Sequence, residues 1–144
     1  MSVSGVEQVA ARFRALPEYV RKQLVQGMTA IGYSFAATVV STKLHGQVLN
    51  QRSGNLATAV AGGVETTDTG SQVTTKVGVL RGPALAYAGI HEYGGDIHRN
   101  GSKKGAYVIH MPERSYLRST LSEQRDAILG KISRVVAEAQ RNGK

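Results

Sequence analysis

One apolar stripe in the N-terminal part of the chain constrains its fold more than any other feature. Apolar side chains recur there at spacings of four, four, three, four and four residues, at Val20, Leu24, Met28, Ile31, Phe35 and Val39. This is the period of one face of an α-helix, so we predict a long helix with Pro17 in its first turn and Gly46 near its end. Further apolar residues widen the stripe, at Val25, Ala30, Ala36, Ala37 and Val40. A helix with so broad an apolar surface is expected to pack against more than one partner.

The segments around this helix predict two short helices and a hairpin. Residues 4–16 predict a short helix before the long one, and residues 56–61 predict another after it. Residues 63–67 and 72–79 are rich in Thr and Val, and they flank the turn sequence DTGS. That pattern predicts an antiparallel β-hairpin.

The C-terminal half predicts one more strand and a final helix. Residues 84–93 fit either a short helix or an extended segment, residues 100–105 predict a basic loop, and residues 106–111 predict a third strand. Apolar residues then return at helical spacing, at Leu117, Leu121, Ile128, Ile132, Val135 and Ala139. The final helix is predicted to begin near Pro112 or at the capping-box sequence TLSE that starts at Thr120.

This order of elements predicts an α+β fold. We expect a long N-terminal helix after a short one, a small antiparallel sheet, and a C-terminal helix packed on the sheet. The 144 residues fit a single domain, with helices in 1–46, sheet and loops in 47–111, and the last helix in 112–144. With only two Phe and no Trp, the core is thin, so we expect burial to be completed against neighbouring subunits.

Composition narrows the classes of function. The chain has no Cys, which removes disulfides, thiolate catalysis and zinc–thiolate sites. It has no run of 18 apolar residues and no secretory signal pattern, so we expect no membrane contact. The net charge of +8 is concentrated toward the two ends, which favours an acidic protein surface or nucleic acid as a partner. No nucleic-acid-binding motif accompanies this charge.

The sequence HEYGGDIH holds four candidate metal or acid–base residues: His91, Glu92, Asp96 and His98. A zinc site on a helix needs two His four residues apart, whereas these two are seven apart and separated by Gly94-Gly95. A metal site built from the loop stays an alternative. The other interpretation is a Gly-Gly turn with Glu92 as an ion-pair or capping partner. Because no nucleophile elbow, Walker loop or dinucleotide fingerprint occurs, we expect no enzymatic activity and no cofactor.

Cations near the start of the last helix need acceptors. Arg114 and Arg118 lie where the positive end of a helix dipole disfavours them, so we expect them to contact Glu92 or a helix C-terminus. The basic loop is a separate candidate. Its residues Arg99, Lys103 and Lys104 serve either solubility or contact with an acidic neighbour, and we expect the segment from His98 to Gly105 to touch a partner.

Several short motifs carry a resemblance when taken in order. They are Arg52-Ser53-Gly54-Asn55-Leu56, Val77-Gly78, Tyr87-Ala88 with Glu92-Tyr93-Gly94-Gly95, and Pro112, Arg114 and Tyr116-Leu117-Arg118. Over about residues 45–122 the chain resembles the minor tail protein Z-like, or tail-completion, components of tailed bacteriophages. Ser115 and Ser119 depart from this pattern, because prolines are usual at both positions.

The resemblance implies a structural protein of the virion neck or tail, assembled in the host cytoplasm. It implies a homo-oligomeric ring, of six subunits by analogy with tail symmetry. Its partners would be the head connector or stopper and the tail terminator or tail tube, with non-specific contact to passing DNA. The interaction residues would be Arg52, Glu92, His98, Arg99, Lys103, Lys104, Arg114, Tyr116 and Arg118.

Three alternatives stay open at this point. One is a tail terminator ring protein, with the contractile or non-contractile type of tail undecided. Another is a small metal-dependent hydrolase that uses His91, Glu92, Asp96 and His98. The last is a nucleic-acid-binding module that uses the net positive charge.

Overall fold

A computed structural model gives the architecture and describes residues 4–46, 48–49, 54–101 and 105–142. Five helices and four strands follow one another along the described chain. They are α1 (Ser4–Arg14), α2 (Glu18–Lys43), α3 (Asn55–Ala61), β1 (Val64–Asp68), β2 (Val73–Val77), α4 (Leu85–Tyr93), β3 (Gly95–Gly101), β4 (Gly105–Met111) and α5 (Leu117–Arg141).

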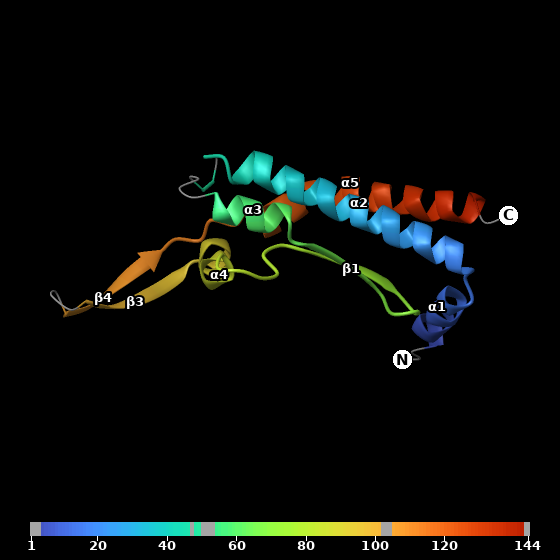
Figure 1. Ribbon diagram of the computed structural model, residues 1–144, viewed down its shortest axis with the longest axis horizontal. Coiled ribbons are helices and arrows are strands. Elements are labelled where there is room, and N and C mark those ends of the chain that lie inside the picture. Colours follow the sequence, from blue (N-terminus) through green and yellow to red (C-terminus); the bar gives the residue numbers. More distant parts are fainter. Residues whose placement is uncertain (1–3, 47, 50–53, 102–104, 143–144) are drawn as a thin grey trace.

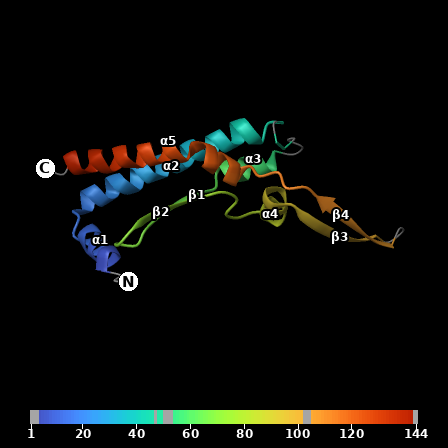
Figure 2. The same ribbon diagram turned by 180° about the vertical axis from the view of Figure 1, so that it is seen from behind.

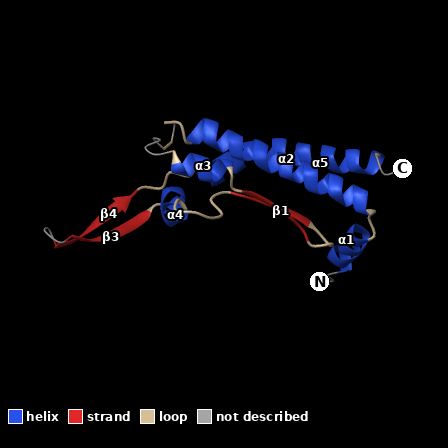
Figure 3. Cartoon of the chain, in the orientation of Figure 1, coloured by secondary structure: helices blue, strands red, loops and turns tan. Residues whose placement is uncertain are grey.

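The molecule is elongated, and its two hairpins occupy different places. In Figures 1 and 2, α2 and α5 run side by side along most of its length, and β1 and β2 lie along α2. At one end α1 folds back beside the tip of this first hairpin. At the other end β3 and β4 project beyond the helices (Figure 3). We call this second hairpin, Gly95–Met111, the arm, and the rest of the described chain the body.

The long helix is the centre of the body, as its wide apolar stripe predicted. It packs against α5, α3 and both strands of the first hairpin, which confirms the expectation of several partners. Ala36 and Val39 are buried with Val60 and Tyr116 in the larger core cluster, and a smaller cluster forms around Leu24 nearer the N-terminus.

Two glycines let α2 approach its neighbours closely. A Cβ at Gly27 would lie 2.3 Å from Val135 Cγ1 of α5, and one at Gly32 would lie 2.7 Å from Val64 Cγ1 of β1. Both distances are too short for a methyl group. Because glycine has no side chain at these two positions, α5 and β1 can pack directly against the backbone of α2.

The α+β class is confirmed, with differences in detail. The strands form two separate antiparallel pairs instead of one small sheet, β1 with β2 and β3 with β4. Residues 84–93, which fitted either conformation, contain α4. Residues 95–101, expected as a turn and part of a basic loop, are strand β3. Their sequence GDIHRNG hides the strand because it contains a single apolar side chain, Ile97.

The last helix also differs from expectation. It begins at Leu117, between the two predicted starts, and Thr120 is a buried residue of its first turn whose hydroxyl donates to the Tyr116 carbonyl (2.7 Å). Leu117 packs in the cluster that contains Val77 of the first hairpin, so the helix meets the sheet there. Over the rest of its length α5 packs on α2.

By length and composition alone, α2 could cross a membrane. Helices in the core of folded proteins meet the same criterion, and α2 lies here between α5 and the first hairpin. The expectation of no membrane contact stays a prediction.

Candidate functional site

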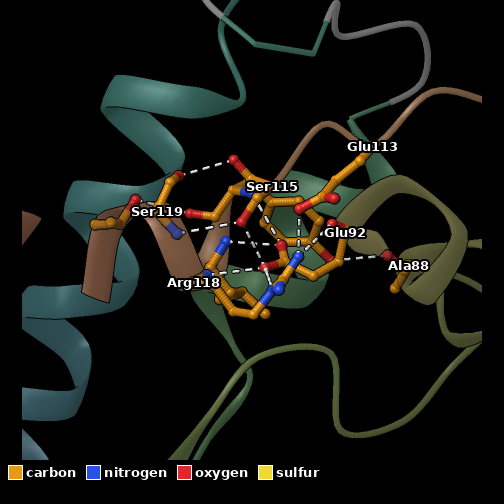
Figure 4. A network of polar contacts seen from close by, with 9 residues as sticks. Ala88, Glu92, Glu113, Ser115, Arg118 and Ser119 are labelled. Carbon is orange, nitrogen blue, oxygen red and sulfur yellow. Dashed lines mark hydrogen bonds and ion pairs between the residues drawn. The ribbon is translucent and has the colours of Figure 1, made fainter. Parts of the chain in front are cut away.

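The best-organised polar site in the described chain surrounds Glu92, in the last turn of α4 (Figure 4). Its side chain is buried, with 3% of the residue exposed. The carboxylate accepts hydrogen bonds from the backbone N–H groups of Tyr116 (2.8 Å), Leu117 (2.9 Å) and Arg118 (2.9 Å). The Ser115 hydroxyl also donates to it, at 2.8 Å. The first N–H groups of a helix have no acceptor inside the helix, so Glu92 caps α5 from a distant part of the sequence.

Arg118 closes the site on its exposed side. Its Nε lies 3.2 Å from Glu92 Oε1, and its Nη2 donates to the Glu92 carbonyl and to the Glu113 carboxylate. Its guanidinium stacks over the Tyr93 ring, 4.6 Å from the centroid. The predicted contact between Glu92 and Arg118 is therefore confirmed. Arg114 joins the same junction through its backbone N–H, which donates to the His91 carbonyl (2.9 Å).

The electrostatics of this junction keep Glu92 ionised. Burial alone would raise the pKa of Glu92, but hydrogen bonds from Leu117, Arg118, Tyr116 and Ser115 outweigh it, and the pKa is lowered. The helix dipole favours a negative charge at this position as well. Burial and the charge of Glu92 raise the pKa of the Tyr116 hydroxyl to about 12, and this hydroxyl donates to the Ala88 carbonyl (3.3 Å).

The arm begins and ends at this junction. Gly94 follows Glu92 by two residues, at φ 70° and ψ −176°, a conformation open essentially to glycine alone. A Cβ at Gly94 would lie 2.7 Å from the Glu113 backbone nitrogen, just beyond the other end of the arm. Both ends of the arm therefore leave the body side by side.

The arm has two faces of different character. Strand pairing places Ile97 opposite Ile109, Arg99 opposite Tyr107 and Gly95 opposite Met111, and side chains alternate between faces along each strand. One face, which we call the apolar face, thus carries Ile97, Arg99, Tyr107, Ile109 and Met111. The other carries Asp96, His98, Asn100, Ala106, Val108 and His110. On the apolar face Tyr107 is 49% exposed and Ile109 is 37% exposed, so the body leaves much of it uncovered.

The structure separates the four candidate metal ligands. Asp96 contacts His110 across the arm (Oδ1 to Nδ1 2.6 Å), and the carboxylate of Glu92 is held by α5. His91 packs edge-to-face on Tyr87 with its Nδ1 buried and without a partner in the described chain, and burial lowers its pKa. Within residues 4–46, 48–49, 54–101 and 105–142, no three His, Asp or Glu side chains gather as metal ligands would.

The predicted interaction residues fall into three groups. Glu92, Arg114, Tyr116 and Arg118 meet at the base of the arm, and His98 and Arg99 lie on it. Arg52, Lys103 and Lys104 lie outside the described residues. Sequence reasoning missed Ser115 and Glu113 as partners in the junction. Ser115 donates to a carboxylate 23 positions earlier, and no local pattern links the two residues. Glu113 accepts from Arg118, five positions later, a pair that sequence reasoning did not consider.

Comparisons with known protein families, with curated proteins and with solved structures find no match to this chain.

Proposed function

We propose that this chain is a structural protein of the neck or tail of a tailed bacteriophage. In this proposal it forms a ring, six subunits by analogy with tail symmetry, that completes the tail and joins it to the head connector or stopper and to the tail terminator or tail tube. It is assembled in the host cytoplasm and has no catalytic role. The tail terminator ring itself is the alternative within the same class.

The observation that carries the proposal is the arm. A two-stranded hairpin is marginally stable alone in water, and this one presents an apolar face that is partly exposed, at Tyr107 and Ile109. Such a surface is typical of a protein–protein contact. A protein whose main exposed feature is a projecting, partly apolar hairpin is suited to assembly more than to catalysis.

The junction at Glu92 supports the same proposal. Two of the motifs behind the resemblance come together there and hold the base of the arm: the one that contains Ala88 and Glu92, and the one that contains Tyr116. Glu92 joins the last turn of α4, next to the base of the arm, to the first residues of α5, and α5 packs on α2. A subunit of a joint between two large assemblies needs a contact arm that is anchored in this way.

The test uses a phage that encodes this chain, with the double substitution Tyr107→Ser and Ile109→Ser. Negative-stain images should then show filled heads and free tails instead of complete particles. Val108→Ser, on the opposite face of the arm, is the matched control and should leave particles complete. Complete particles after deletion of the whole gene, or absence of the protein from purified virions, would rule the proposal out.

A further inference from the structure

The arm needs a receiving surface, and the body offers one on α5. We propose that the apolar face of the arm docks on the exposed side of α5 of a second copy of this chain, arm to helix. The ring itself comes from the proposed function, on which this inference rests. The inference adds the two surfaces through which neighbouring subunits of the ring touch.

The receiving surface is a band of exposed apolar side chains along α5. Leu121 and Leu129 are each 52% exposed and Val136 is 40% exposed. Spacings of eight and seven residues place these three on one side of a helix. The α5 residues that face the body are different ones, such as Thr120, Val135 and Ala139. This band, Leu121–Leu129–Val136, is therefore a second apolar surface of α5.

The apolar face of the arm matches about half of the band in length. From Tyr107 to Met111 the face spans about 13 Å, at roughly 3.3 Å per residue. From Leu121 to Leu129 the helix rises about 12 Å, at roughly 1.5 Å per residue. An arm laid along α5 would therefore cover the band from Leu121 to Leu129.

Each surface also carries or borders a charged residue that the other can pair with. Arg99 lies beside Tyr107 on the apolar face of the arm. Arg125 lies between Leu121 and Leu129 on the α5 band, and Asp126 lies next to it along one side of the band. In the described part of the chain, neither Arg99 nor Asp126 has an ion-pair partner. Arg99 can pair with Asp126 of the second copy while Arg125 stacks on the Tyr107 ring.

The placement of the surfaces favours a second copy over the chain's own helix. Both views show the arm projecting from one end of the molecule, while α5 runs away from it toward the other end (Figures 1 and 2). The arm cannot reach the far part of its own band. A contact between two different surfaces is heterologous, and repetition of such a contact closes into a ring or grows as a filament.

The absence of Cys from the chain allows a direct test. We would prepare two purified single variants, Tyr107→Cys on the arm and Leu129→Cys on the band, mix them and oxidise them mildly. The expected result is a cross-linked product of twice the chain mass in the mixture, and little of it in either variant alone. A chain carrying both substitutions should give a ladder that ends in one closed species. Val108→Cys, on the opposite face of the arm, mixed with Leu129→Cys should give at least fivefold less product.

Charge exchange supplies a second readout in the cysteine-free chain. Arg99→Glu should reduce the oligomer seen by light scattering, and Asp126→Arg added to it should restore it. The inference is overturned if the mixture gives no more product than the Val108→Cys control, or if cross-links form only within each single variant, which indicates a two-fold contact. It is also overturned if adding Asp126→Arg to Arg99→Glu does not restore the oligomer, although circular dichroism shows that both variants are folded. The two proposals can fail separately. If the cross-links form as expected but phage particles are complete after deletion of the gene, the proposed function is wrong and the contact between arm and α5 is still supported.

Discussion

The carboxylate of Glu92 lies 2.9 Å from the backbone nitrogen of Leu117, the first residue of α5. A side chain at the end of one helix thus supplies the cap at the start of another, 25 residues later. Tyr116, the N-cap residue itself, makes no side-chain capping bond. The position of α5 relative to α4 and to the arm therefore depends on this carboxylate.

Removing the cap should destabilise the body. We expect Glu92→Ala to lower the free energy of unfolding by about 2–4 kcal/mol, because several buried N–H groups lose their acceptor. Glu92→Gln should cost less, since the amide oxygen can still accept. Urea denaturation measures both. Arg118→Met removes only the half-exposed partner and should cost less than Glu92→Ala; equal losses would mean that the ion pair matters more than the cap.

The contribution of Glu92 should depend on pH in one direction. Its pKa is lower in the folded chain than its ordinary value of 4.5, so its stabilisation is complete above that value and is lost as the pH falls through the folded pKa. The difference in melting temperature between the wild type and Glu92→Gln should be constant near neutral pH and shrink below about pH 4.5. A difference that is the same at pH 7 and pH 3 would contradict a charged cap.

Gly94 should be far less tolerant of substitution than its neighbour in α4. Gly94→Ala places a Cβ 2.7 Å from the Glu113 nitrogen in a backbone conformation that disfavours L-residues, and we expect a loss of about 2 kcal/mol or more. Gly89→Ala is the matched control, because a Cβ there meets no atom within 4 Å. It should leave stability unchanged or raise it by up to about 1 kcal/mol through helix propensity. Thermal unfolding of the two variants decides the matter, and similar losses in both would contradict the turn assignment.

The close contact between α2 and α5 should show size compensation. Gly27→Ala forces the new methyl group into Val135 and should cost about 1–3 kcal/mol. Val135→Ala alone leaves a gap and should also destabilise, by about 1–3 kcal/mol. In the double variant the added methyl fills part of the gap, so the combined loss should be smaller than the two losses added. Additive losses in a double-mutant cycle would show that the helices separate instead of packing at this point.

Local periodicity explains which elements could be predicted. The apolar stripe from Val20 to Val39 lies within one continuous stretch of sequence, and so does the Thr/Val pattern around DTGS. Each pattern therefore predicts its own helix or hairpin without information from the rest of the chain. Charge reasoning at a helix start predicted the contact between Arg118 and Glu92, because a cation there requires an acceptor.

Residues 106–111 were correctly predicted as a strand and form β4 of the arm, but strand β3 and the cap could not be predicted in the same way. Strand β3 has one apolar side chain, and part of the arm's apolar face stays exposed. The alternation of apolar and polar residues that would predict this strand is therefore weak. The cap joins Glu92 to Ser115 and Tyr116 across the whole arm, and sequence spacing carries no sign of such a contact. The phage neck or tail function and the partners expected from the resemblance stay predictions.

The side-by-side departure of the two arm strands at Gly94 and Glu113 has an evolutionary consequence. Since the body closes at the junction whatever lies between these residues, the arm can be lengthened, shortened or exchanged at small entropic cost. Descendants of this chain could change their binding specificity by recombination within residues 95–111, with the ancestral body inherited intact.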